Sequence, residues 1–175
     1  MNLWHDITPG TPGEITTIIE INKGSKNKYE IDKKIGLIAL DRVMHTSQDY
    51  PFDYGFIPQT LGDDGDPLDV VLLTTYPLFP GIMVKVREVA VMHMVDGGEG
   101  DEKIIAVPVE DPRFNDIKDI KDVNPHTIKE IEHFFLTYKN LQNKKVVING
   151  WGDAKKATEI FHQSIKNYND KFGKN

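Results

Sequence analysis

Cysteine and long hydrophobic runs are both missing from this chain of 175 residues. Without cysteine there can be no disulfide framework, no thiolate metal site and no cysteine nucleophile. The purely apolar stretches extend over only a few residues, whereas a helix that spans a bilayer needs about 20. The N-terminal stretch MNLWHDITPG lacks the basic segment and the apolar core of a signal peptide. We therefore expect a cytoplasmic protein that has no membrane partner.

Basic residues are absent from a long central stretch, because no Lys or Arg lies between Arg42 and Lys85. The same stretch contains six aspartates, namely Asp49, Asp53, Asp63, Asp64, Asp66 and Asp69. Their carboxylates have no local counter-charge, so they must be solvated, paired from elsewhere in the fold or neutralised by a bound cation. The whole chain carries a net charge of −6 and has no basic stripe, which argues against a nucleic-acid partner.

The order of the expected elements indicates an α+β fold. Short β-branched runs bounded by turn residues predict strands at residues 15–21, 29–31, 36–40, 70–73, 83–95, 104–109 and 146–148. Asn124, followed by Pro125, predicts the start of a helix, and Asp153 predicts the cap of a second helix. Many short strands followed by helices are typical of a small barrel or sandwich with helices packed around it. A chain of this length is expected to form one domain over residues 1–175.

The segment DGDPLD, residues 64–69, contains the densest group of carboxylates. Asp64 and Gly65 form a turn pair, since glycine accepts backbone angles that other residues avoid. The proline that follows Asp66 favours an extended backbone there, and Asp69 then opens an apolar strand. Such a bend can direct three carboxylates into one small volume.

Three convergent carboxylates repel one another unless a hard cation lies among them. Oxygen ligands suit Mg²⁺, Mn²⁺ or Ca²⁺ better than Zn²⁺, which prefers nitrogen and sulfur. An EF-hand is excluded, because Asp69 and Thr75 stand where its loop needs glycine and glutamate. The remaining alternative is an ordinary acidic loop exposed to solvent, and the residue pattern alone leaves it open.

A second acidic group, DGGEGDE at residues 96–102, lies in the loop between two predicted strands. Alone it is typical of a flexible polar turn, and it does not match GxGxxG because position 103 is lysine. If the strands at 70–73 and 83–95 are neighbours, the two acidic groups can face each other across a site for several metal ions, as in phosphoryl chemistry. A phosphate-binding loop of the GxxxxGK[ST] type is absent from the sequence.

Taken together, the motifs of this sequence resemble those of one known family. The chain is similar over nearly its whole length to the family I soluble inorganic pyrophosphatases of the prokaryotic type. The segments that carry the resemblance are IIEI at 18–21, NKYEID at 27–32, LDR at 40–42, YPFDYGFIPQT at 50–60, DGDPLDV at 64–70, DGGEGDEK at 96–103, AVPVEDP at 106–112, IKDVN at 120–124 and HFFLTYK at 133–139. Of these, DGDPxDV is the family signature.

The resemblance implies both a fold and an activity. The fold is a five-stranded β-barrel of the oligonucleotide-binding (OB) type flanked by helices, with two main helices in the C-terminal third. The activity is the hydrolysis of inorganic pyrophosphate to two orthophosphates, with a metal-activated water as the nucleophile. The implied cofactor is Mg²⁺, several ions in each active site, with Mn²⁺ as the alternative ion. The prokaryotic-type members assemble as homohexamers.

The resemblance also implies roles for individual residues. Asp66 matches the residue that accepts a proton from the attacking water. The implied metal ligands are Asp64, Asp69 and Asp101 for the tightest ion, Asp69 for a second ion, and Asp96 and Asp101 for ions that arrive with the substrate. The implied contacts to substrate phosphates are Lys28, Arg42, Tyr54, Lys103, Tyr138 and Lys139. The implied supporting residues, which hold metal-bound water and orient their neighbours, are Glu20, Glu30 and Tyr50.

Two functions of other classes remain as alternatives to a magnesium-dependent hydrolase. One is a non-catalytic OB-type module that binds single-stranded nucleic acid, and the other is an inactive metal-binding scaffold. Taken singly, the site residues also have ordinary explanations. Lys28 and Glu30 share a face that is exposed in most strands, Tyr138 ends an apolar helical stripe, and Arg42 ends a strand as surface charges often do. Only their combination favours a site.

Overall fold

The computed structural model describes residues 1–173 of the chain. Its strands are β1 (Gly10–Thr11), β2 (Glu14–Ile21), β3 (Asn27–Ile31), β4 (Ile38–Val43), β5 (Asp53–Phe56), β6 (Asp69–Leu72), β7 (Met83–Asp96), β8 (Glu99–Gly100), β9 (Lys103–Pro108) and β10 (Val146–Asp153). The α-helices of this part of the chain are α1 (Pro125–Thr137) and α2 (Ala154–Phe172). None of the described helices is long and apolar enough to cross a membrane.

A closed ring of five strands forms the centre of the fold. Hydrogen-bonded neighbours follow the order β2, β5, β6, β9 and β7, and β7 pairs back to β2 and closes the ring. The β6–β9 pair is parallel, and the other pairs of the ring are antiparallel. The predicted α+β fold with a five-stranded barrel and two main helices near the C-terminus is therefore confirmed.

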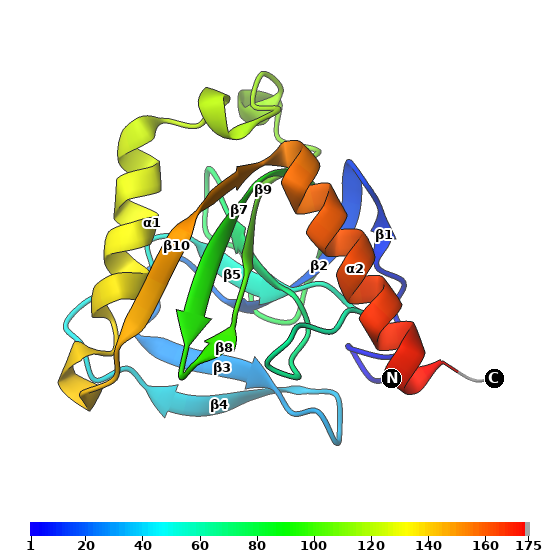
Figure 1. Ribbon diagram of the computed structural model, residues 1–175, viewed down its shortest axis with the longest axis horizontal. Helices are drawn as coiled ribbons and strands as arrows, with labels where there is room; N and C mark the ends of the chain where they lie inside the picture. Colours follow the sequence, from blue (N-terminus) through cyan, green and yellow to red (C-terminus); the bar gives the residue numbers. More distant parts are fainter. Residues whose placement is uncertain (174–175) are drawn as a thin grey trace.

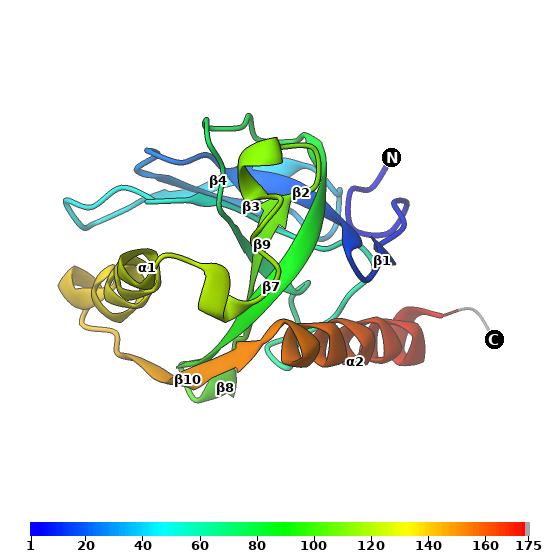
Figure 2. The same ribbon diagram turned by 90° about the horizontal axis from the view of Figure 1, so that it is seen from above.

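The helices and the remaining strands surround this ring. Figures 1 and 2 show α1 and α2 on different sides of the ring strands, with β10 between them. β10 pairs with β7 in antiparallel orientation, so both helices are anchored next to the ring. β3 and β4 form a separate two-stranded antiparallel sheet beside the ring. This hairpin and the C-terminal end of α1 are the two elements that complete the site described below.

Both predicted helix starts are confirmed by their capping hydrogen bonds. The Asn124 side chain accepts a hydrogen bond from the backbone N–H of His126, and a proline occupies the first position of α1. The Asp153 carboxylate accepts from the backbone N–H of Lys156 at the start of α2. Phe134 and Phe135 of α1 are buried against the core, which directs the end of this helix, and Tyr138 just after it, toward the ring.

Two strand predictions need correction. The strand expected at residues 36–40 lies at Ile38–Val43, and β5 was not predicted at all. The sequence DYGF of β5 contains Asp and Gly, which are both depleted in strands. Here the fully buried Asp53 carboxylate accepts hydrogen bonds from the backbone N–H groups of Lys23 (2.8 Å) and Leu78 (3.1 Å), so β5 owes its place to partners distant in sequence.

Gly55 of β5 lies so close to β2 that no side chain fits there. A Cβ atom at this position would stand 2.8 Å from the carbonyl carbon of Ile18 and 3.0 Å from the Cα of Ile19. We therefore expect Gly55→Ala to lower the free energy of unfolding by about 1–3 kcal/mol, because backbone atoms must move to admit the methyl group. Urea denaturation measures this change. A variant as stable as the wild type would contradict the close packing of β2 on β5.

Candidate active site

A cavity of about 360 Å³ opens between the ring strands, the β3–β4 hairpin and the end of α1. Every residue that the sequence analysis assigned to a site lines this one cavity: Glu20, Lys28, Glu30, Arg42, Tyr50, Tyr54, Asp64, Asp66, Asp69, Asp96, Asp101, Lys103, Tyr138 and Lys139. The first and the last of them, Glu20 and Lys139, are more than one hundred positions apart in the sequence. From sequence, the two acidic groups were expected to meet only if their strands were neighbours. Both groups line the same cavity.

The acidic loop that leads into β6 holds the bend predicted from its sequence. Gly65 has a φ of +84°, and the backbone N–H of Asp66 donates a 3.0 Å hydrogen bond to Oδ1 of Asp64. The backbone N–H of Gly62 donates to the carbonyl of Asp66 at 2.7 Å. These local bonds turn Asp64 and Asp66 toward the cavity, while Asp69 reaches it from the first position of β6.

The parallel pairing of β6 and β9 brings the acidic loop to the second acidic group. Asp69 stands opposite Lys103 in the strand register, and Asp101 precedes Lys103 by two residues. The Lys103 ammonium group lies 2.5 Å from the Asp69 carboxylate and 2.6 Å from the Asp101 carboxylate. Only 4% of the Lys103 side chain is exposed, so this triad is shielded from water.

The ionisation of these groups reflects their crowding. Burial and the neighbouring Asp101 carboxylate raise the pKa of Asp64 to about 6. Burial also raises the pKa of Asp101, with Lys103 opposing the rise and Asp69 adding to it. Burial alone would lower the pKa of Lys103, but Asp69 and Asp101 raise it above its ordinary value. The negative charge of the cavity is thus only partly balanced by Lys103.

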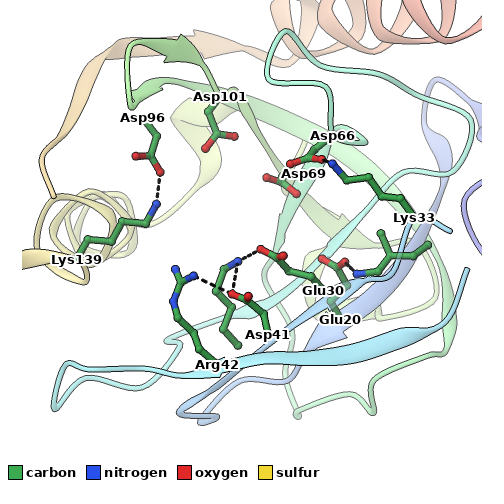
Figure 3. Close-up of polar contacts among 12 residues, drawn as sticks. Glu20, Glu30, Lys33, Asp41, Arg42, Asp66, Asp69, Asp96, Asp101 and Lys139 are labelled. Carbon is green, nitrogen blue, oxygen red and sulfur yellow. Dashed lines mark hydrogen bonds and ion pairs between the residues drawn. The ribbon is translucent and has the colours of Figure 1, made fainter. Parts of the chain in front are cut away.

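Two further lysines of the cavity are also paired with carboxylates. Figure 3 shows Lys139 in contact with Asp96 and Lys33 in contact with Asp66. As they stand, no three His, Asp or Glu side chains within residues 1–173 form a group that could hold a metal ion. Asp64, Asp66 and Asp69 line one cavity, as expected, and the ammonium groups of Lys33 and Lys103 contact Asp66 and Asp69.

The β3–β4 hairpin supplies the basic side of the cavity. Lys28 of β3 forms an ion pair with Glu30 on the same strand, which confirms that the two side chains share a face. Asp41 of β4 lies 3.4 Å from the Lys28 ammonium group and 2.8 Å from the guanidinium group of Arg42. Burial lowers the pKa of Lys28, while the Asp41 carboxylate opposes that change.

Tyrosine side chains form the wall of the cavity next to α1. Tyr50, Tyr54 and Tyr138 are buried and belong to an aromatic cluster that includes Phe134 and Phe135. Burial raises the pKa of Tyr50 and Tyr54 well above the ordinary value and also raises the pKa of Tyr138. All three hydroxyl groups therefore keep their protons near neutral pH and can donate hydrogen bonds.

Comparison with known proteins identifies this arrangement. A family model described as inorganic pyrophosphatase matches residues 17–169. An inorganic pyrophosphatase of Nostoc sp. is 50% identical over 157 residues, which cover 90% of this chain and 93% of the relative. One from Haloferax volcanii is 47% identical over 175 residues, 98% of this chain and 99% of the relative.

The chain belongs to the inorganic pyrophosphatase family. It is accordingly a hydrolase of the inorganic diphosphatase class, whose reaction is the hydrolysis of inorganic pyrophosphate. The crystal structure of inorganic pyrophosphatase from Thermus thermophilus superposes with a TM-score of 0.91 at 47% sequence identity, and it covers 96% of this chain and 99% of that one. The pyrophosphatase fold therefore extends over nearly the whole chain.

Several residues of this pyrophosphatase cavity were missed by the sequence analysis. Lys33 and Lys144 line the cavity, and Asp41 contacts Lys28 and Arg42 from β4, whereas Glu99, which also lines it, belongs to the second acidic group noted in the sequence. Lys33 and Asp41 lie next to or within the segments NKYEID and LDR that carried the resemblance, so these segments were the available signal. Lys144 had no such signal, because it lies outside the quoted motifs. It follows Asn143, whose backbone is left-handed with a φ of +55°.

The raised pKa of Glu20 can be measured through the pH dependence of protein stability. Its carboxylate accepts a 2.8 Å hydrogen bond from the backbone N–H of Ile31. Burial raises the pKa of Glu20 to about 8, with the Asp69 carboxylate adding to the rise. The folded state therefore binds a proton that the unfolded state releases above about pH 4.5, and this stabilisation is lost as the pH rises through about 8.

We expect Glu20→Gln to become more stable than the wild type as the pH rises, because Gln keeps the hydrogen bond without the buried charge. In urea denaturation with EDTA, the advantage of the variant should be small at pH 5 and on the order of a few kcal/mol at pH 9. Glu14→Gln, at the exposed start of β2, measures the effect of losing one negative charge alone. An advantage of Glu20→Gln that does not change with pH would contradict a buried, protonated Glu20.

Proposed function

We propose that this cavity hydrolyses inorganic pyrophosphate to two orthophosphates with several Mg²⁺ ions, with water as the nucleophile and Asp66 as the proton acceptor. One observation carries the proposal. Carboxylates from two acidic segments line the cavity together with lysine, arginine and tyrosine donors. The carboxylates suit hard cations, and the donors suit phosphate oxygens.

The carboxylate group fits divalent cations by its chemistry and by its charge. Asp64, Asp69 and Asp101 offer only oxygen donors, the ligands that Mg²⁺ prefers. Burial raises the pKa values of Asp64 and Asp101, the neighbouring carboxylates add to the rise, and a divalent ion would offset that negative charge. In the proposed site these three residues hold the tightest ion, Asp69 also contacts a second ion, and Asp96 with Asp101 holds ions that arrive with the substrate; Mn²⁺ is the alternative ion. When bound, such ions offset the charge of pyrophosphate and lower the pKa of a coordinated water.

Asp66 is placed to take a proton at the edge of the acidic loop. Its Oδ1 atom forms an ion pair with the Lys33 ammonium group, and the remaining lone pairs of the carboxylate are available to accept further hydrogen bonds. The side chain as a whole is 46% exposed, which leaves a route for the proton to reach water. A carboxylate within reach of the attacking water can accept its proton and hold it in line with the phosphorus.

The basic and phenolic residues bind the substrate phosphates in this proposal. They are Lys28, Arg42, Tyr54, Lys103, Tyr138 and Lys139. Charged donors form short, strong hydrogen bonds with phosphate oxygens and stabilise the negative charge that develops on the leaving phosphate. Burial keeps the hydroxyl protons on Tyr54 and Tyr138, so both act as donors at neutral pH. Glu20, Glu30 and Tyr50 support the site by holding water and orienting these donors.

Three further features belong to the same proposal. We infer that residues 1–175 form one pyrophosphatase domain, that the protein acts in the cytoplasm and that it assembles as a homohexamer. The resemblance to prokaryotic-type pyrophosphatases supports the assembly, and the absence of cysteine agrees with a reducing compartment. The nucleic-acid-binding alternative is disfavoured, because the carboxylates of the cavity would repel a phosphodiester backbone.

Replacing the proton acceptor tests the mechanism. We expect Asp66→Asn to lower the turnover number by about 100-fold or more, since general-base catalysis contributes about 10²–10⁴. Phosphate release at saturating pyrophosphate and Mg²⁺ measures this effect, and circular dichroism checks that the variant folds. Asp63→Asn is the matched control, because Asp63 lies in the same loop but does not line the cavity. Unchanged turnover in Asp66→Asn would remove Asp66 from the mechanism.

Removing the metal and changing the substrate test the activity itself. We expect rapid phosphate release from pyrophosphate with Mg²⁺, and loss of that release with excess EDTA, because the carboxylates then lack the cations that admit a polyanion. A nucleoside triphosphate under the same conditions should be hydrolysed much more slowly. Strong triphosphate cleavage with Mg²⁺ would contradict the proposed substrate.

A further inference from the structure

Thr60 joins the two ends of the acidic loop, residues 61–67, from a fully buried position. Its hydroxyl group donates a 2.6 Å hydrogen bond to the carbonyl of Ile57 and accepts a 2.9 Å hydrogen bond from the backbone N–H of Leu68. The backbone N–H of Ile57 also donates to the carbonyl of Leu68 at 2.9 Å. Leu68 directly precedes Asp69, so the hydroxyl of Thr60 ties the start of the loop to the residue before a cavity carboxylate.

The N-terminal segment holds Thr60 from the other side. The indole N–H of the buried Trp4 donates a 3.0 Å hydrogen bond to the carbonyl of Thr60. The backbone N–H of Gln59 donates to the carbonyl of Trp4 at 2.8 Å, and the Gln59 side-chain amide donates to the carbonyl of His5 at 2.8 Å. Gln59 has a φ of +51°, a left-handed conformation that is unusual for a residue other than glycine. Such strain persists where surrounding contacts enforce it.

These contacts lie behind the cavity and do not form its wall. Trp4, Gln59 and Thr60 are not among the residues that line it. The loop itself is closed by few internal bonds, chiefly from Gly62 N–H to the carbonyl of Asp66 and from Asp66 N–H to Asp64. The repulsion between its carboxylates favours a more open loop, and the bonds at its base oppose that opening together with those that join Leu61 to Ser164 and Asn167 of α2.

We propose that Thr60, anchored by Trp4, is a positioning residue that holds the acidic loop in the geometry required to bind a divalent cation. This inference rests on the proposed function, in which Asp64 and Asp69 are metal ligands. Residues that orient the ligands of a metal site, without touching the metal, commonly change its affinity by 10–100-fold when they are replaced. Thr60 would act in this way on two ligands through the backbone of their loop.

Three variants and Mn²⁺ alone as the probe test the inference. Thr60→Val keeps the shape of the side chain and removes both hydrogen bonds, whereas Thr60→Ser keeps the hydroxyl group. Thr17→Val is the matched control, because Thr17 is also fully buried but its hydroxyl has no hydrogen-bond partner in the described structure. Free Mn²⁺ is measured by electron paramagnetic resonance during titration of each full-length protein, and urea denaturation records its stability separately.

We expect the dissociation constant of Mn²⁺ to rise about tenfold or more in Thr60→Val and to stay near the wild-type value in Thr60→Ser and Thr17→Val. A Thr60→Val variant that loses stability but binds Mn²⁺ as tightly as the wild type would overturn the inference. If Thr60→Val does not fold, Trp4→Phe removes the indole hydrogen bond and takes its place: weaker Mn²⁺ binding supports the inference, and unchanged binding overturns it. Failure of the wild type to bind Mn²⁺ would instead overturn the proposed metal site, and the positioning role with it.

Discussion

The pairing of buried carboxylates with lysines is the interaction on which the cavity of this protein depends. Asp69 and Asp101 lie against one ammonium group, that of Lys103, in a place where water is largely excluded. Taking either charge out of water is costly unless the other lies beside it. Removing the lysine would leave two carboxylates without their shared partner, and removing both carboxylates would leave a buried ammonium group unpaired. The buried lysine and the two carboxylates therefore stabilise one another.

The closed ring is what brings these charges together. β6 and β9 are parallel, so the acidic loop before β6 and the acidic segment before β9 end at the same edge of the ring. β7 pairs with both β9 and β2. Glu20 belongs to β2, so this pairing brings it to the same cavity from an early part of the chain. The β3–β4 hairpin and the end of α1 then add basic and phenolic side chains from outside the ring. Backbone pairing thus does most of the positioning, and the side chains complete it.

Local chemistry made part of this structure predictable from sequence. Asn124 and Asp153 start helices because their side chains cap free N–H groups, and the turn at Gly65 depends on a backbone angle that glycine accepts. The fourteen residues named from the family resemblance all line one cavity, although their roles stay predictions. What the sequence could not show depends on distant partners. The buried Asp53 of β5 accepts hydrogen bonds from Lys23 and Leu78, and the indole of Trp4 donates to Thr60 across 56 positions.

The pairing of lysines with carboxylates has a consequence for the proposed reaction. Lys103 and Lys139, which are proposed to bind phosphate, now contact Asp69, Asp101 and Asp96. A phosphate that approaches these lysines competes with the carboxylates for the same N–H donors, and it would leave the carboxylates uncompensated. In the proposed site, cations bound among the carboxylates would remove that competition and release the lysines for the substrate. An acidic protein could in this way bind a polyanion, because the cations proposed for the site would balance the carboxylates while the lysines contact the phosphate.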